Sequence, residues 1–139
     1  MADQFSRTRL LVGDEPLARL AAAKVAVFGV GGVGGFCVEA LARAGVGTLH
    51  LYDDDTVSES NLNRQIVALH STIGQPKAEV MARRILDINP ACQVEVFRMF
   101  YLPENADQVD LSQYDYVVDC IDTVAAKLDL VERCTTLQV

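Results

Sequence analysis

The chain has 139 residues, of which half are hydrophobic and 22% are charged. This composition is typical of one globular domain and excludes disordered chains, collagen-like repeats and small disulfide scaffolds. The formal net charge of −7 argues against general electrostatic binding of nucleic acid, although it leaves room for a local basic pocket. The chain shows no secretory signal and no apolar run near the roughly 18 residues of a membrane helix, so we expect a cytoplasmic protein without membrane contact.

The cysteines are widely spaced, and no two of them form a C-x-x-C pair. They are Cys37, Cys92, Cys120 and Cys134. A zinc site built from these residues alone is therefore not expected. Without a secretory signal, we expect reduced thiols.

Helix-like and strand-like segments alternate along the chain. We expect helices over 14–22, 31–44, 76–89 and 123–134. We expect strands over 24–30, 48–52, 94–100 and 114–121. The continuous apolar run at 24–30 is typical of a parallel strand with both faces covered. This alternation predicts an α/β, Rossmann-like doubly wound sheet of about four parallel strands in the order 3-2-1-4, with helices on both faces.

A glycine-rich turn, Gly29–Gly34, follows the first expected strand and opens a helix as G-x-G-x-x-G. Gly29 would permit the tight turn, Gly31 would let the backbone approach a phosphate closely, and Gly34 would let helix and strand pack together. Asp53 ends the second strand about 20 residues further on, where a carboxylate can accept ribose hydroxyls. The motif therefore predicts a nucleotide site; the alternative is that the glycines serve helix–sheet packing alone.

Two basic residues follow in the polar stretch after the second strand. Lys77 falls in the first turn of an expected helix, where the helix dipole makes a cation unfavourable unless an anion is bound nearby. Together with Arg64, it suits a triphosphate better than the pyrophosphate of a dinucleotide. The alternative is a solvated loop with ordinary surface charges.

A pair of carboxylates, Asp119 and Asp122, lies at the end of the fourth expected strand. In the order 3-2-1-4, this end borders the same crevice as the glycine turn. Asp122 is therefore a candidate Mg²⁺ ligand, because magnesium takes one or two carboxylates plus phosphate oxygens. The alternative role is an N-cap of the last helix.

Several motifs together resemble a known family in order and spacing. They are Gly29–Gly34, Asp53-x-Asp55, Ser60–Gln65, Lys77 and Asp119–Asp122. They resemble the adenylation domain of the ubiquitin-activating-type enzymes, the ThiF/MoeB superfamily. Supporting stretches at 38–47, 61–69 and 87–90 are most similar to the tRNA threonylcarbamoyladenosine dehydratase group.

The resemblance implies an ATP site in which Asp53 binds the ribose. Asn61, Arg64 and Lys77 would contact the phosphates, and Asp122 would hold Mg²⁺. The other implied binding positions are Gly29, Gly31, Gly32, Gly34, Asp55, Ser60 and Gln65.

The resemblance also implies a homodimer, because Arg7 matches an arginine that reaches into the partner subunit's ATP site. The implied catalytic set is Arg7, Arg64, Lys77 and Asp122. A substrate carboxylate would attack the α-phosphate with loss of pyrophosphate, while basic residues and magnesium offset the growing charge. In the dehydratase group, that carboxylate is the threonylcarbamoyl group of a modified tRNA adenosine, which then cyclises with net loss of water.

Three alternatives stay open. The chain could activate the C-terminal glycine of a ubiquitin-like sulfur-carrier protein, with a sulfur-relay partner. It could instead be an NAD-binding oxidoreductase module, or a nucleotide-binding module without turnover. Each would use the same glycine turn for a different ligand or partner.

The chain departs from the family pattern in two respects. It has Asp122-Thr123 where many relatives carry Asp-Asn. Relatives also continue beyond the last helix, so we expect residues 1–139 to be the N-terminal portion of a longer adenylation domain, with a fifth strand beginning near 137–139. Zinc-binding cysteine pairs and a catalytic cysteine would fall in that later part, and Cys120 and Cys134 are expected to be core residues.

Overall fold

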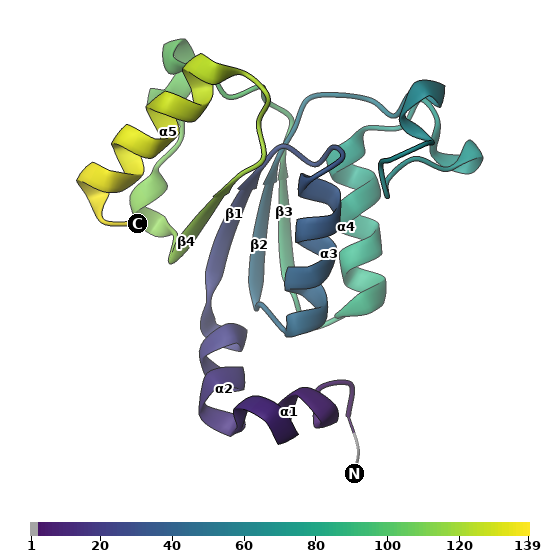
Figure 1. Ribbon diagram of the computed structural model, residues 1–139, viewed down its shortest axis with the longest axis vertical. Helices are drawn as coiled ribbons and strands as arrows, with labels where there is room; N and C mark the ends of the chain where they lie inside the picture. The colour runs from purple at the N-terminus through teal and green to yellow at the C-terminus, as the bar shows by residue number, and fades with distance from the viewer. Residues whose placement is uncertain (1–2) are drawn as a thin grey trace.

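One parallel β-sheet organises the chain, and the computed structural model describes residues 3–139. Its strands are β1 (Lys24–Phe28), β2 (Thr48–Tyr52), β3 (Gln93–Phe97) and β4 (Tyr116–Asp119). They lie in the order β3-β2-β1-β4, which confirms the predicted topology (Figure 1). Because all four run in the same direction, their carboxyl ends meet at one edge of the sheet, the upper edge in Figure 1.

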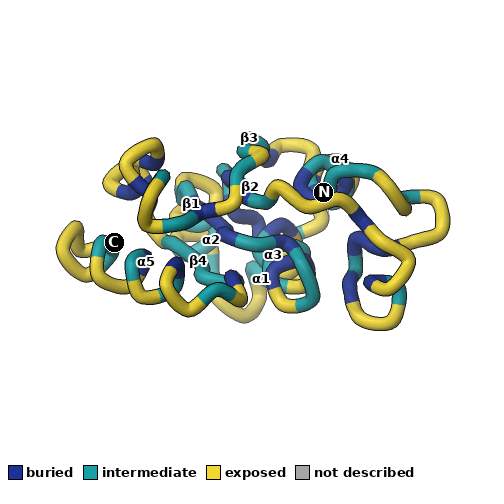
Figure 2. The backbone as a smooth tube through the Cα atoms, turned by 90° about the horizontal axis from the view of Figure 1, so that it is seen from above, coloured by how far each residue is buried: buried dark blue, intermediate teal, exposed yellow. Residues whose placement is uncertain are grey.

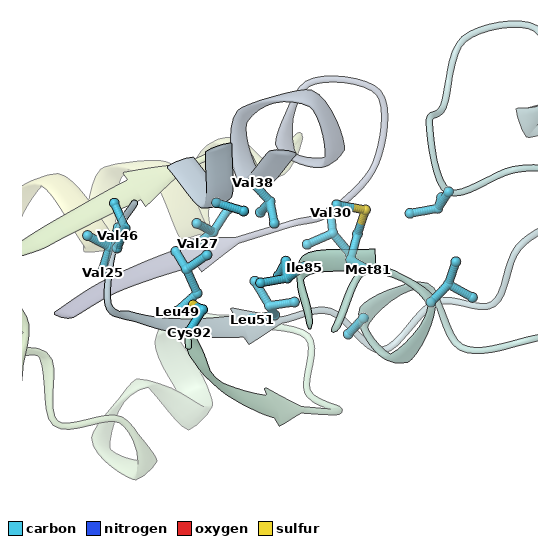
Figure 3. Packing of buried hydrophobic residues seen from close by; sticks show 14 of the residues in the cluster. Val25, Val27, Val30, Val38, Val46, Leu49, Leu51, Met81, Ile85 and Cys92 are labelled. Carbon is cyan, nitrogen blue, oxygen red and sulfur yellow. The ribbon is translucent and has the colours of Figure 1, made fainter. Parts of the chain in front are cut away.

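Two helices cover one face of the sheet, α3 (Gly34–Ala44) and α4 (Lys77–Ile88). Strand residues such as Val27 and Leu51 point toward them and are fully buried, together with Met81 of α4 (Figure 3). Side chains alternate between the two faces of a strand, so every second residue of β1 and β2 joins this core. Seen from above in Figure 2, the buried segments follow the sheet and the inner sides of the helices.

The other face is covered mainly over β1 and β4. Its covering elements are η3 (Pro103–Gln108), η4 (Leu111–Gln113) and α5 (Val124–Leu137). Ala126 and Leu130 of α5 pack against Ala26 and Phe28 of β1 in a second hydrophobic cluster. Helices therefore lie on both faces, as predicted.

The N-terminal helices α1 (Ser6–Val12) and α2 (Asp14–Ala22) project from the opposite, amino-terminal edge of the sheet (Figure 1). Only α2 was expected. Helix α1 buries no residue, and its Leu10 and Leu11 are 86% and 87% exposed. A helix shows an amphipathic pattern when one of its faces is buried on the core. Helix α1 has no such face, so its sequence lacks the pattern that would have predicted it.

The remaining differences from the predicted elements lie at their ends. The first strand stops at Phe28 because Gly29 adopts φ +90°, which turns the chain before α3 begins at Gly34. The third and fourth strands are also shorter than expected. At the far end, α5 continues to Leu137 and Gln138 is left-handed, so a helix end occupies the place where a fifth strand was expected to begin.

The connection between β2 and α4 is irregular and polar, as expected. It contains the short 3-10 helices η1 (Glu59–Asn61) and η2 (His70–Thr72). In residues 3–139, no helix is both long and apolar enough to span a membrane.

Candidate functional site

A cleft of about 630 Å³ lies at the carboxyl ends of the strands. Loops that follow β1, β2, β3 and β4 all contribute to its lining. Ligands of open α/β sheets bind at this edge, where the strand order reverses. The predicted site residues that line the cleft are Gly29, Gly31, Gly32, Asp53, Asp55, Asn61, Arg64, Gln65, Lys77 and Asp122.

The glycines of the turn have two different roles. A Cβ at Gly34 would lie 1.7 Å from the carbonyl oxygen of Gly29, and a Cβ at Gly29 would lie 2.6 Å from that of Cys120. These two glycines therefore allow close packing of backbone on backbone. Gly31 and Gly32 face the cleft, where a Cβ would meet only side chains at 3.5 Å or more. The packing explanation thus holds for Gly34, whereas Gly31 and Gly32 leave room for a ligand.

Asp53 joins the end of β2 to the glycine turn. Its Oδ2 accepts a hydrogen bond from the Val30 N–H at 2.9 Å, and its Oδ1 accepts one from the Asp55 N–H at 2.8 Å. Burial raises the pKa of the Asp53 carboxyl, and these two backbone bonds oppose part of that rise. Each carboxylate oxygen retains acceptor capacity for a ribose hydroxyl.

Lys77 is a buried cation at the first position of α4. Its side chain is 7% exposed, and its Nζ lies 3.2 Å from Oδ2 of Asp55, whose own side chain is 71% exposed. The Lys77 N–H also donates to the carbonyl oxygen of Asp55 at 3.0 Å. The fold thus holds an ammonium group at a helix N-terminus with one solvated counter-ion, an arrangement that an anion in the cleft would stabilise.

The last residue of η1 and the residues that follow it supply further polar groups. Asn61 is buried and uses its Oδ1 to accept the Ser58 N–H at 2.9 Å, which leaves its amide nitrogen as a donor at the cleft. Arg64 is exposed, and its Nη1 donates to the Ser60 carbonyl at 3.0 Å. Gln65 is 8% exposed, and its Oε1 has no hydrogen-bond partner within the described part of the chain. Ser60 itself lies outside the cleft lining and orients Arg64 through its carbonyl.

The two carboxylates after β4 have separate environments. Asp119 accepts the Ile121 N–H at 3.0 Å and pairs with Lys127 Nζ at 2.9 Å, so the fold uses both of its oxygens. Asp122 lines the cleft and is exposed, with no side-chain hydrogen bond or ion pair to residues 3–139. The N-cap of α5 is Thr123 rather than Asp122, so the capping alternative for Asp122 is wrong.

One end of the cleft is apolar and was not predicted from the sequence. Its residues are Phe28, Tyr52, Met99, Phe100 and Tyr101. Two are the last residues of β1 and β2, and the others follow β3 directly. Aromatic residues at strand ends were the available signal, but their convergence depends on the path of the chain after β3.

The cysteines behave as packing residues rather than as nucleophiles. All four are free, and each is at least partly buried. Burial raises the pKa of Cys120, which lies at the cleft edge, to about 11. A thiol with such a pKa is protonated near neutral pH and is a poor nucleophile.

Arg7 does not line the cleft. It is exposed in α1, at the edge of the sheet opposite the carboxyl ends (Figure 1). Within one copy of the chain, Arg7 and the cleft are therefore separated by the length of the sheet.

Comparison with known proteins places these features in context. The ThiF family matches residues 5–139. The tRNA threonylcarbamoyladenosine dehydratase of Bacillus subtilis is 50% identical over 134 residues, which cover 96% of this chain and 53% of that protein. The SAMP-activating enzyme E1 of Haloferax volcanii is 37% identical over 134 residues, covering 95% of this chain and 49% of that enzyme.

A solved structure shares the fold closely. The crystal structure of Escherichia coli tRNA N6-threonylcarbamoyladenosine dehydratase in complex with ATP superimposes with a TM-score of 0.92 at 44% identity. The match covers 98% of this chain and 56% of that one. The chain thus spans about half the length of the relatives that it matches.

Proposed function

Because the chain belongs to the ThiF family, we propose that it binds ATP in the cleft and adenylates a substrate carboxylate. The carboxylate is the threonylcarbamoyl group of a modified tRNA adenosine, and the acyl-adenylate then cyclises with net loss of water. The observation that carries this proposal is Lys77, a buried ammonium that faces the cleft beside the glycine turn. The relatives that share this fold support the choice of nucleotide and substrate.

Each part of ATP has a matching group in the cleft. The ribose hydroxyls bind Asp53, whose orientation is held by its bonds to Val30 and Asp55. The phosphates lie over Gly31 and Gly32, where N–H groups near the start of α3 point at an anion. The base occupies the apolar end of the cleft, against Met99 and Phe100.

Arg64 and Lys77 bind the phosphate oxygens and offset the negative charge that grows when the substrate carboxylate attacks the α-phosphate. Lys77 is well suited to this role because its ammonium is already desolvated and held in position by α4. Asn61 donates its amide N–H to the same phosphates.

Asp122 fits a magnesium site of the kind that nucleotides use. No group of three or more His, Cys, Asp or Glu residues within 3–139 could hold a metal by itself. A single free carboxylate beside phosphates is nevertheless sufficient, because Mg²⁺ takes most of its ligands from phosphate and water. When bound there, magnesium would neutralise charge on the leaving pyrophosphate.

The proposed active form is a homodimer in which Arg7 enters the cleft of the other copy. Arg7 lies too far along the sheet from its own cleft to contribute there. Helix α1 also exposes Leu10 and Leu11, which a second copy would bury. Because the proposed substrate is a tRNA, we propose that the reaction takes place in the cytoplasm.

A second candidate function is activation of the C-terminal glycine of a ubiquitin-like sulfur-carrier protein. The similarity to the SAMP-activating enzyme E1 favours it. Both reactions adenylate a carboxylate, so the nucleotide site is the same and the substrate decides between them. The redox alternative with NAD is disfavoured, because two cations at the cleft, Arg64 and Lys77, suit a triphosphate better than the pyrophosphate of a dinucleotide.

ATP–pyrophosphate exchange distinguishes these functions. The purified chain is assayed alone, with tRNA that carries threonylcarbamoyladenosine, with the same tRNA lacking the modification, and with a ubiquitin-like sulfur-carrier protein. Exchange that depends on the modified tRNA supports the proposal. Exchange that depends on the carrier protein favours the second candidate, and tight NADH binding without ATP binding would refute both.

A further inference from the structure

The segment that follows β3 forms a wall of the cleft and is held by α5. Residues 98–102 leave β3 and cross above the sheet toward α5 (Figure 1). On the way, Met99, Phe100 and Tyr101 line the apolar end of the cleft. The wall is not part of a helix or strand, so its position depends on contacts with its neighbours: the Asn105 side chain in η3 donates to the Phe100 carbonyl at 2.7 Å and accepts the Leu102 N–H at 2.9 Å.

Tyr101 supplies the contacts that tie this segment to β1 and α5. Its side chain is 2% exposed, and its ring meets Phe28 edge-on, with centroids 5.0 Å apart. Its hydroxyl donates a hydrogen bond to Oδ2 of Asp129, in the middle of α5. Burial, reinforced by the Asp129 carboxylate, raises the pKa of Tyr101, so the hydroxyl stays a donor at neutral pH.

Asp129 is itself held by an ion pair, made through the same Oδ2 that accepts the Tyr101 hydroxyl. Arg133, one turn further along α5, lies 3.1 Å from Asp129 Oδ2 and also pairs with Asp107 of η3 at 3.0 Å. The Asp129 side chain is 19% exposed, so this pairing is partly shielded from solvent. The acceptor for Tyr101 is therefore held in place before any ligand enters the cleft.

The same helix begins at the opposite wall. Asp122 and Thr123 line the cleft and lead directly into α5 at Val124. The Tyr101–Asp129 bond thus connects the apolar wall after β3 to the helix that carries the Asp122 wall. Movement of one wall relative to the other would change the width of the cleft.

We propose that Tyr101 and Asp129 are positioning residues that set the width of the base end of the ATP cleft. This inference rests on the proposed binding of ATP. Neither residue needs to touch the phosphates; Tyr101 holds Met99 and Phe100, and Asp129 holds Tyr101. Guanine carries a 2-amino group and an N1–H that adenine lacks, so a narrow apolar pocket leaves more polar groups of guanine without partners, and the same bond contributes to selection of ATP over GTP.

The test removes one hydroxyl. Tyr101→Phe keeps the ring against Phe28 and leaves Asp129 paired with Arg133, so no buried charge loses its partner. The matched control is Tyr116→Phe on β4, because Tyr116 is 64% exposed and its hydroxyl makes no hydrogen bond within 3–139. Calorimetric titration gives the Kd of each protein for ATP and for GTP, and thermal unfolding gives its Tm.

We expect the Kd for ATP to rise about two- to tenfold in Tyr101→Phe, which corresponds to one hydrogen bond. We also expect the ratio of the GTP Kd to the ATP Kd to fall, while Tyr116→Phe matches the wild type. Asp129→Asn keeps an acceptor for the Tyr101 hydroxyl and should retain most of the ATP affinity. Asp129→Ala removes that acceptor and should reproduce the effect of Tyr101→Phe, which provides a second route if one variant does not fold.

The outcomes separate this inference from the proposed function. If the wild type binds ATP and the Tyr101 and Asp129 variants change Tm alone, with unchanged Kd values and an unchanged GTP-to-ATP ratio, the positioning role is refuted and the function stands. If the wild-type chain binds no ATP, the proposed function is refuted, and the positioning role that rests on it is refuted as well. Weaker ATP binding with reduced selectivity in both Tyr101→Phe and Asp129→Ala supports the positioning role.

Discussion

At the scale of single residues, the most informative group is the Lys77 ammonium, because the fold stabilises its charge poorly. Lys77 has its ammonium in a nearly closed environment, where the exposed Asp55 is its only charged partner among residues 3–139. Removing a charge from water is costly, and a solvated counter-ion repays only part of that cost. The sequence had already indicated a cation at an unfavourable helix position, and the structure adds that this cation is buried and lines a cleft.

Replacing Lys77 by methionine separates function from stability. Lys77→Met keeps the length of the side chain and removes its charge, so we expect a Tm equal to or above that of the wild type. Substrate-dependent ATP–pyrophosphate exchange should fall roughly 100-fold or more, as for the loss of one preorganised charge-stabilising group. Exchange within a few-fold of the wild type would remove Lys77 from the proposed mechanism.

At the scale of elements, the turn between β1 and α3 decides how closely strand and helix approach. Gly34 packs on the carbonyl of Gly29, whereas a Cβ at Gly32 would have Cγ of Arg64, at 3.9 Å, as its nearest neighbour. The G-x-G-x-x-G spacing already assigned Gly31 to the phosphate and Gly34 to packing, but only the packed structure shows that Gly29 also lies against backbone and that Gly32 faces the cleft.

A pair of glycine substitutions tests this division. Gly34→Ala should lower the free energy of unfolding by about 3 kcal/mol or more, because its methyl group would overlap a backbone carbonyl. Gly32→Ala should leave the free energy of unfolding within about 1 kcal/mol of wild type but weaken ATP binding, because it fills space beside the phosphates. Urea unfolding and ATP titration of both variants measure these effects; equal stability of the two would contradict the assignment.

Strand β2 contains a pH-sensitive element. His50 is buried, and its Nδ1 lies 2.8 Å from the Tyr114 hydroxyl, while its Nε2 lies 3.3 Å from Glu95. Burial, together with the charge of Lys24, lowers the pKa of His50 below its ordinary value of 6.5, and Glu95 opposes part of that change. The unfolded chain therefore binds more protons than the folded chain as the pH falls through 6.5.

This protonation difference predicts that the wild-type free energy of unfolding decreases from about pH 7.5 to about pH 5.5, as unfolded His50 becomes charged. His50→Gln keeps a hydrogen-bond acceptor for Tyr114 and does not titrate, so its decrease over the same range should be smaller. Urea unfolding of both proteins at each pH checks the expectation. If the free energy of unfolding decreases equally in both proteins, groups other than His50 cause the pH dependence.

At the scale of the whole molecule, the position of α1 separates Arg7 from the cleft of its own chain. A site that uses Arg7 must therefore combine two copies. The acidic net charge of −7 also means that the proposed tRNA substrate requires a local basic surface, because the overall charge does not attract phosphates.

Mixing two inactive variants tests the shared site. Arg7→Ala and Lys77→Met should each lose substrate-dependent exchange, whereas an equimolar mixture, unfolded and refolded together, should regain part of it. The recovery is expected because a mixed dimer contains one cleft with both an intact Lys77 and an intact partner Arg7. A mixture as inactive as its components would contradict sharing of the site between copies.

Local patterns in the sequence were sufficient for the sheet, its strand order and half of the residues that line the cleft. Alternating apolar and amphipathic segments specify parallel strands and crossovers, and crossovers of one hand bring the strand ends to a common edge. The glycine turn, Asp53 and Lys77 could be placed at that edge because each adjoins a strand or helix end, whereas the phosphate contact of Arg64, in the irregular stretch, came from the family resemblance.

The tertiary structure decided what depends on contacts between distant segments. Burial of Lys77, the free state of Asp122 and the hydrogen bond from Tyr101 to Asp129 involve groups whose environments come from other elements. Helix α1 gave no signal because it packs nothing against the core. Sequence periodicity records which face of an element is apolar, but the distances and desolvation that make a binding site arise only when those elements pack together.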